Sequence, residues 1–158
     1  MATKSNAVSN AEKNELSITR ILNAPRELVF EVWSTPNHIA NWWGPNGFTN
    51  TIHKMDFVPG GEWNFIMHGP DGTNYINKIV FNDIIKPELI SYTHVTTPKF
   101  KVNVTFKKYG DKTKLNMHMM FENTQAYNMA MNTFGAKEGL NQTANRLADY
   151  LGKTLNRF

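Results

Sequence analysis

The sequence has no cysteine, and this absence excludes several kinds of stabilisation and chemistry. Disulfide bonds, thiolate metal sites and cysteine nucleophiles cannot form, and a reducing compartment is the simplest assumption. No apolar run approaches the roughly 18 residues needed to span a bilayer, and the first 14 residues have no signal-peptide pattern. We therefore expect a cytoplasmic protein that does not bind membranes.

The sequence also lacks the common motifs of catalysis and of cofactor binding. No serine nucleophile motif and no glycine-rich phosphate loop is present. The histidines are scattered without the spacing of a metal site: His38, His53, His68, His94 and His118. We expect no metal and no cofactor, and the sequence favours a non-enzymatic protein over an enzyme.

An excess of basic residues raises the question of nucleic-acid binding, because the formal net charge is +4. Lysines concentrate between residues 99 and 114, where only Asp111 opposes them. The positions between these lysines are apolar, which is typical of a β-hairpin with one solvated face. We therefore expect no nucleic-acid partner, and assign to that face Lys99, Lys101, Lys107, Lys108, Lys112 and Lys114.

Aromatic residues are abundant, with ten Phe, five Tyr and four Trp among 158 residues. This is more ring surface than a packed core of this size needs, so an internal cavity lined by rings becomes a reasonable expectation.

The periodicity of apolar residues predicts one domain, residues 15–158, after a flexible leader, residues 1–14. A strand over 16–22 precedes two short helices, 25–35 and 37–42, and then apolar residues recur with period two. Turn sequences at 59–61 and 69–72 separate the strands, and Tyr109-Gly110-Asp111 closes the last hairpin.

A long helix is predicted over residues 125–155, where no proline occurs. We expect a bend or break near Gly135 and Gly139, whose small size lets the helix approach the sheet closely. The apolar face of this helix is the only surface large enough to cover the sheet, and consists of Leu140, Ala144, Leu147, Leu151 and Leu155. The fold class is therefore α+β, with an antiparallel sheet of about six or seven strands.

Several motifs, in order, resemble one known family over about residues 15–155. They are Ala24-Pro25 with Val29-Phe30, Trp42-Trp43-Gly44-Pro45 with Gly47-Phe48, Pro59-Gly60-Gly61 with Trp63, Pro70-Asp71-Gly72, and Pro87-Glu88. The chain is similar to the activator of heat-shock-protein-ninety ATPase homologue group of the START-like (SRPBCC, polyketide cyclase and lipid-transport) superfamily.

That resemblance implies a helix-grip fold, in which a curved sheet wraps around the C-terminal helix and encloses a cavity. Relatives often carry Trp at the position of Leu140, so the shape of the cavity differs here. Only some eukaryotic relatives act on the chaperone, and these usually carry an additional N-terminal domain. A leader of about 14 residues makes a chaperone partner the less expected one.

The candidate ligand-binding residues combine apolar rings and thioethers with a few polar anchors. They are Trp43, Phe48, Trp63, Phe65, Met67, Tyr75, Asn77, Tyr92, His94, Met117, Met119 and Phe134. Two residues are weak catalytic candidates. Asp56 lies near the end of an apolar strand, where burial would raise its pKa, although its carboxylate could instead cap the turn. His94 shares a face with Ile90 and Tyr92, although a histidine whose hydrogen bonds are satisfied by the backbone is the simpler interpretation.

Three functions remain open at this stage. The first is binding or carriage of an apolar or aromatic small molecule, without catalysis. The second is a cyclase- or isomerase-like enzyme that uses the same cavity. The third is a chaperone-associated interaction module. An uncovered strand edge could also pair two copies as a homodimer.

Overall fold

The structure is a computed structural model that describes residues 6–155. The strands are β1 (Val8–Asn10), β2 (Glu15–Leu22), β3 (Thr49–Met55), β4 (Glu62–His68), β5 (Asn74–Ile85), β6 (Leu89–His94), β7 (Phe100–Tyr109) and β8 (Lys112–Phe121). The helices are α1 (Arg26–Ser34), α2 (Pro36–Ile39), α3 (Thr124–Asn128) and α4 (Ala136–Leu155), with a π-helical turn, η1 (Met129–Thr133), between α3 and α4.

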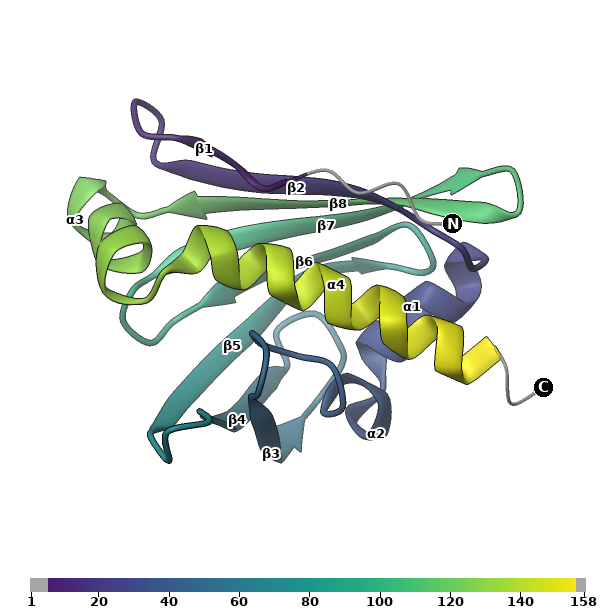
Figure 1. The fold of residues 1–158 in the computed structure, drawn as a ribbon, viewed down its shortest axis with the longest axis horizontal. Helices are drawn as coiled ribbons and strands as arrows, with labels where there is room; N and C mark the ends of the chain where they lie inside the picture. Colours follow the sequence, from purple (N-terminus) through teal and green to yellow (C-terminus); the bar gives the residue numbers. More distant parts are fainter. Residues whose placement is uncertain (1–5, 156–158) are drawn as a thin grey trace.

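All eight strands form one antiparallel sheet in the order β1-β2-β8-β7-β6-β5-β4-β3. The long helix α4 runs across one face of this sheet, while α1 and α2 lie near the end of the sheet that the C-terminal end of α4 reaches (Figure 1). Strands on one side and helices on the other make an α+β protein of two layers, as predicted from the periodicity.

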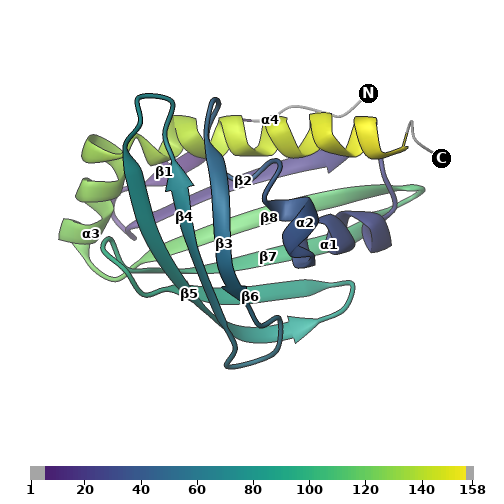
Figure 2. The same cartoon turned by 90° about the horizontal axis from the view of Figure 1, so that it is seen from below.

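The sheet bends strongly between its two halves. Figure 2 shows β3, β4 and β5 running steeply across the direction of β2 and β8. The register shifts between Phe81 and Ile84 in β5, and again between Ile52 and Lys54 in β3. Such irregularities increase the local twist, and so turn the edge half of the sheet towards α4.

The tight turn between β3 and β4 explains the glycine pair at residues 60 and 61. Gly60 has a φ of +81°, a conformation that L side chains rarely adopt, and its N–H donates to the Phe81 carbonyl oxygen over 2.7 Å. A Cβ atom at Gly61 would collide with the carbonyl oxygen of Asp56. Both positions therefore require glycine for the turn to dock on β5.

The prediction for residues 1–14 needs a correction. Residues 8–10 form β1, which pairs with β2 and adds an eighth strand to the six or seven expected. Ala7 is buried, and its N–H donates to the Asn141 side chain over 2.7 Å. Polar composition concealed this strand, since an edge strand of three residues needs no apolar pattern; residues 1–5 lie outside the described part of the chain.

The expected long helix is divided where the sequence suggested a break. Gly135 has a φ of +59°, and separates the turn η1 from α4. Gly139 lies inside α4 without a break. A Cβ atom at residue 139 would lie 3.3 Å from Pro45. The small size of Gly139 therefore allows close approach of the 43–48 loop, and not of the sheet.

The buried face of α4 is close to the predicted one. Leu140, Ala144, Leu147 and Leu151 are buried as expected, together with Thr143 and Thr154. Leu155 is wrongly predicted, because it is 36% exposed at the end of the helix. None of the helices in residues 6–155 is long and apolar enough to cross a membrane.

Replacing Leu147 with alanine tests whether α4 holds the fold together. Leu147 is 1% exposed, so removing its side chain leaves a cavity in the core. We expect the free energy of unfolding to fall by about 2–5 kcal/mol. Denaturant unfolding followed by circular dichroism measures the change, with the exposed Lys153→Ala on the same helix as the control. A loss below about 0.5 kcal/mol for Leu147→Ala contradicts the assigned face.

Candidate functional site

Two adjoining cavities lie between the sheet, the 43–48 loop, η1 and α4. The larger has a volume of about 510 Å³ and the smaller of about 180 Å³. The residues that line both are Pro45, Met67, Asn77, His94, Phe100, Met119, Phe134 and Ala136. This shared wall joins them into one candidate site for a small molecule.

Eleven of the twelve residues predicted from the sequence line these cavities. Phe48 and Tyr75 line the larger one, whereas Trp43, Phe65, Tyr92 and Met117 line the smaller one. The remaining five, Met67, Asn77, His94, Met119 and Phe134, line both. Alternation in β4, β5, β6 and β8 is the signal that located most of them.

Trp63 is the exception among the predicted residues. It faces the same layer as Phe65, but is 1% exposed and is not among the cavity-lining residues. Its ring stacks on Phe65 at 4.2 Å and meets the edge of Trp43 at 5.2 Å. Trp63 thus belongs to the packed core behind the cavity.

Sequence reasoning missed fifteen lining residues, most of which come from loops, from η1 and from α4. The segment 44–45, the cavity-facing residues of η1 and the first turns of α4 have no periodic pattern that points to a cavity. Phe100 and Phe121 had the correct alternation and could have been found. The other lining residues that sequence reasoning missed are Gly44, Pro45, Asn74, Ile76, Ile79, Thr97, Pro98, Ala130, Thr133, Ala136, Gly139, Leu140 and Thr143.

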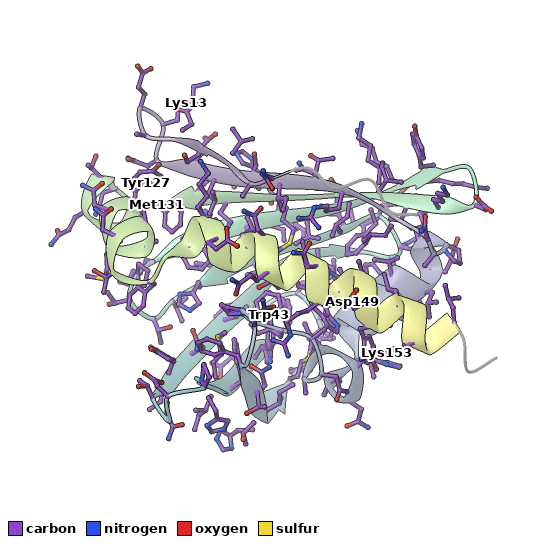
Figure 3. The ribbon with its side chains drawn as sticks, in the orientation of Figure 1. Lys13, Trp43, Tyr127, Met131, Asp149 and Lys153 are labelled. Atoms are coloured by element: carbon purple, nitrogen blue, oxygen red, sulfur yellow. The ribbon has the colours of Figure 1, made fainter. Side chains whose placement is uncertain are left out.

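The larger cavity opens to solvent beside three aromatic rings. Tyr75 lies between Phe48, at a centroid distance of 5.8 Å, and Phe134, at 6.3 Å. Phe134 is 48% exposed, and so borders the opening. In Figure 3, Tyr127 and Met131 mark the α3–η1 end of the molecule, whereas Asp149 and Lys153 lie towards the opposite end of α4. The opening is therefore next to the N-terminal end of α4.

Arg146 on α4 fixes the loop that forms one wall. Its guanidinium donates to five backbone carbonyl oxygens, over distances of 2.9 to 3.4 Å. These carbonyls belong to Asn41, Trp43, Gly44, Pro45 and Phe48. A guanidinium carries five N–H donors in a rigid plane, which suits a ring of carbonyls better than the single ammonium group of lysine.

His94 is the central polar group of the cavity. Its ring stacks on Phe100 with centroids 4.5 Å apart, and only 6% of the residue is exposed. Nδ1 lies 2.9 Å from the Pro98 carbonyl oxygen, which can only accept, so Nδ1 carries a proton. Nε2 lies 2.7 Å from Asn77 Oδ1 and 3.1 Å from Thr96 Oγ1.

Burial sets the protonation of the two titratable groups on this part of β6. Desolvation lowers the pKa of His94, and the hydrogen bonds to the backbone of Pro98 and Thr96 oppose this effect without reversing it. Burial also raises the pKa of the Tyr92 hydroxyl. Both side chains are therefore neutral near pH 7. Among the described residues that line the two cavities, none is Asp, Glu, Lys or Arg.

Asp56 does not belong to the site. Its side chain is exposed, which contradicts the weaker of the two interpretations of this residue, a buried carboxyl with catalytic potential. The backbone carbonyl of Asp56 accepts from Val58 N–H over 2.9 Å, in the turn before β4. The residue follows β3 at the edge of the sheet, where no element covers its side chain, and alternation alone could not indicate this.

The antiparallel sheet that curves around α4 is a helix-grip fold. Solved structures with this fold include a protein from Arthrobacter aurescens (TM-score 0.88, 22% identity, 96% of this chain and 93% of that one). Protein Ms6760 from Mycobacterium smegmatis gives a TM-score of 0.83 and 20% identity, over 93% of this chain and 96% of that one.

An AHSA1-like protein from Aeromonas hydrophila gives a TM-score of 0.70 and 20% identity, over 89% of this chain and 93% of that one. None of the curated proteins matches the sequence. The profile of the family described as "Activator of Hsp90 ATPase homolog 1-like protein" matches residues 23–152. The chain belongs to that family, as the motifs in its sequence had indicated.

Removing the guanidinium of Arg146 should loosen the wall of the cavity. We expect Arg146→Met to lower the free energy of unfolding by at least about 2 kcal/mol, because it leaves five carbonyls without their charged donor. Arg146→Lys should recover only part of this loss. Urea unfolding provides the measurement, and Lys153→Met on the exposed side of α4 is the control. An Arg146→Met variant as stable as the control would contradict the assignment.

His94 should make the protein less stable in mild acid. Its pKa is lowered in the folded state, so the unfolded chain binds the proton more readily. The contribution is fully present above the ordinary histidine pKa of about 6.5, and is lost as the pH falls below that value. Urea unfolding of wild type and His94→Gln between about pH 8 and about pH 5 should show a smaller pH dependence in the variant. Identical pH dependence in the two proteins would contradict this account. The control is His53→Gln on the exposed side of β3, which should keep the pH dependence of the wild type.

Proposed function

We propose that the protein binds an apolar or aromatic small molecule in the cavity between the sheet and α4. The observation that carries this proposal is a lining of rings and methionine side chains without a formal charge. Thioethers are flexible and polarisable, so Met67, Met117 and Met119 can adapt to ligands of different shape. Asn77 and His94 supply the few polar contacts that orient a ligand in such a site.

The size of the cavity agrees with this proposal. A volume of about 510 Å³ lies within the range of sites for drug-sized ligands. An aromatic group of about 150–250 Å² gains several kcal/mol on burial, at about 25 cal/mol per Å². Association costs reduce this gain, so micromolar affinity is a reasonable expectation.

An enzymatic function has less support than binding. The alternative of a cyclase- or isomerase-like enzyme required an acid and a base in the cavity, and Asp56 lies outside it. His94, Tyr75 and Tyr92 remain as the titratable side chains of the described lining, and Nδ1 of His94 is held by a backbone carbonyl. General acid–base catalysis needs the group to reach the substrate proton, and Nε2 is the only ring nitrogen left for that role.

The chaperone-associated alternative draws its support from the name of the family, which refers to activation of the Hsp90 ATPase. Stimulation of that ATPase by the pure protein is the direct test, with bovine serum albumin as the control. We expect no stimulation. An increase in ATP hydrolysis that depends on the concentration of this protein would favour the interaction module over the carrier.

A neutral apolar dye tests the carrier proposal. We expect N-phenyl-1-naphthylamine to bind with micromolar affinity and to quench tryptophan fluorescence, because Trp43 lines the cavity. Met119→Trp adds a large ring from the β8 side, and should weaken dye binding at least about tenfold while the unfolding midpoint changes little. Titration followed by fluorescence, combined with thermal unfolding, measures both effects.

The control is the neighbouring residue on the same strand. Met120 pairs with Lys101 and Glu15, and alternation places it on the face of the sheet opposite to Met119. Met120→Trp should leave dye affinity unchanged. Loss of stability in Met119→Trp, combined with no dye binding by the wild type, would show that the interior is a packed core.

A further inference from the structure

One of the three hydrogen-bond partners of the His94 ring, Asn77 Oδ1, does not suit its neutral state. Asn77 Nδ2 donates to the Tyr75 carbonyl oxygen over 3.0 Å, and this contact directs Asn77 Oδ1 towards His94 Nε2. In the neutral ring Nδ1 holds the proton, so Nε2 has a lone pair. The Thr96 hydroxyl can donate to this lone pair over 3.1 Å, but Asn77 Oδ1 faces it at the shorter distance of 2.7 Å. Turning the amide would instead place Asn77 Oδ1 against the Tyr75 carbonyl. Both arrangements leave one acceptor facing another.

A second proton on the ring removes this conflict. In the imidazolium form Nδ1–H donates to the Pro98 carbonyl and Nε2–H donates to Asn77 Oδ1. Burial opposes that form, because a charge in an apolar site without a partner is costly. The hydrogen bonds therefore favour protonation of His94, while burial opposes it and lowers its pKa.

Among residues 6–155, none of the groups that face His94 is an anion. Asn77 faces the ring from β5, Phe100 stacks on it from β7, and Thr96 and the Pro98 carbonyl face it from the following loop. Tyr75 and Tyr92 are the other titratable residues of the described cavity lining, and the residues contributed by β8, η1 and α4 carry no charge. The described lining therefore supplies no counter-ion to His94, and a bound anion would supply one.

We propose that the site takes an aromatic ligand with an acidic group, a carboxylate or phenolate, whose oxyanion pairs with protonated His94. This inference rests on the proposed function, and specifies the class of ligand. An oxyanion that replaces Asn77 Oδ1 beside Nε2 accepts the same proton, and also brings the missing negative charge. The apolar body of the ligand occupies the cavity lined by rings and methionines.

Formation of this ion pair places one additional proton on His94. When the ligand enters as its anion, the proton on Nε2 comes from the solvent; when it enters as the neutral acid, the proton passes from the ligand to His94. Near neutral pH an aromatic carboxylic acid is ionised and His94 is neutral, so binding requires a proton from solvent. Affinity should fall as the pH rises.

Two probes of nearly identical shape test the inference. 2-Naphthoate carries the acidic group, and 2-naphthamide is its neutral counterpart. We expect wild-type affinity for 2-naphthoate to fall at least about tenfold between about pH 6 and about pH 8, and that for 2-naphthamide to change little. Calorimetry in buffers of different ionisation enthalpy should show uptake of one proton with 2-naphthoate. Equal affinities for 2-naphthoate at the two pH values would overturn the inference.

Two substitutions locate the effect at His94. His94→Gln should abolish the pH dependence of 2-naphthoate binding, whereas His118→Gln, on the outer face beside Glu15, should retain it. Asn77→Asp places a carboxylate beside Nε2, and should raise the His94 pKa measured by NMR while it weakens binding of 2-naphthoate more than that of 2-naphthamide. An unchanged His94 pKa in Asn77→Asp would contradict the assignment even if His94→Gln failed to fold.

The outcomes separate this inference from the function on which it rests. If the protein binds N-phenyl-1-naphthylamine but does not prefer 2-naphthoate to 2-naphthamide at about pH 6, the acidic ligand is rejected and the carrier proposal stands. Binding of no probe would reject both.

Discussion

The cavity exists because Arg146 holds the 41–48 segment on α4 through five backbone carbonyls. Those carbonyls would otherwise need partners from water, since the segment follows α2 and precedes β3 without regular structure. The guanidinium draws them to one point, so Trp43, Pro45 and Phe48 stand as a fixed wall opposite the sheet. Gly139 completes the contact, because a larger residue would push Pro45 away from the helix.

The opposite wall comes from the bend of the sheet. Register shifts in β3 and β5 turn the edge strands, and bring Met67 and Asn77 towards residues from β6 and β8. The break at Gly135 then lets η1 and Phe134 lie at the opening instead of continuing the axis of α4. The helix therefore covers the sheet at Leu147 and Leu151, and leaves space near its N-terminal end. Close packing at one end and a cavity at the other are two results of the same arrangement.

The charge state of His94 in this cavity depends on the absence of charged residues from the described lining. His94 has acceptors on both ring nitrogens, but no carboxylate among the residues that line the cavity. Burial lowers its pKa, so the ring is neutral near pH 7. The apolar surroundings screen charges poorly, so a charged group of a ligand would interact strongly with the His94 ring. The same feature thus reduces stability in acid and favours an anionic ligand.

The sequence by itself determined the class of the fold and most of the inward-facing residues. Alternation of apolar residues in β4 to β8 identified Met67, Tyr92 and Met119, since a strand places every second side chain on one face. The helical spacing from Leu140 to Leu151 identified the covering helix for the same kind of reason. Local periodicity is enough wherever a regular element has one buried side.

Only the tertiary structure decided the position of β1, the exposure of Asp56 and Leu155, and the clamp made by Arg146. Trp63 and Phe65 have the same pattern, yet one is packed behind the cavity and the other lines it. These outcomes depend on which distant segments meet, and a pattern along one chain segment does not contain that information. The contact between His94 and Asn77 joins two strands in the same way, so its chemistry became visible only in the folded protein.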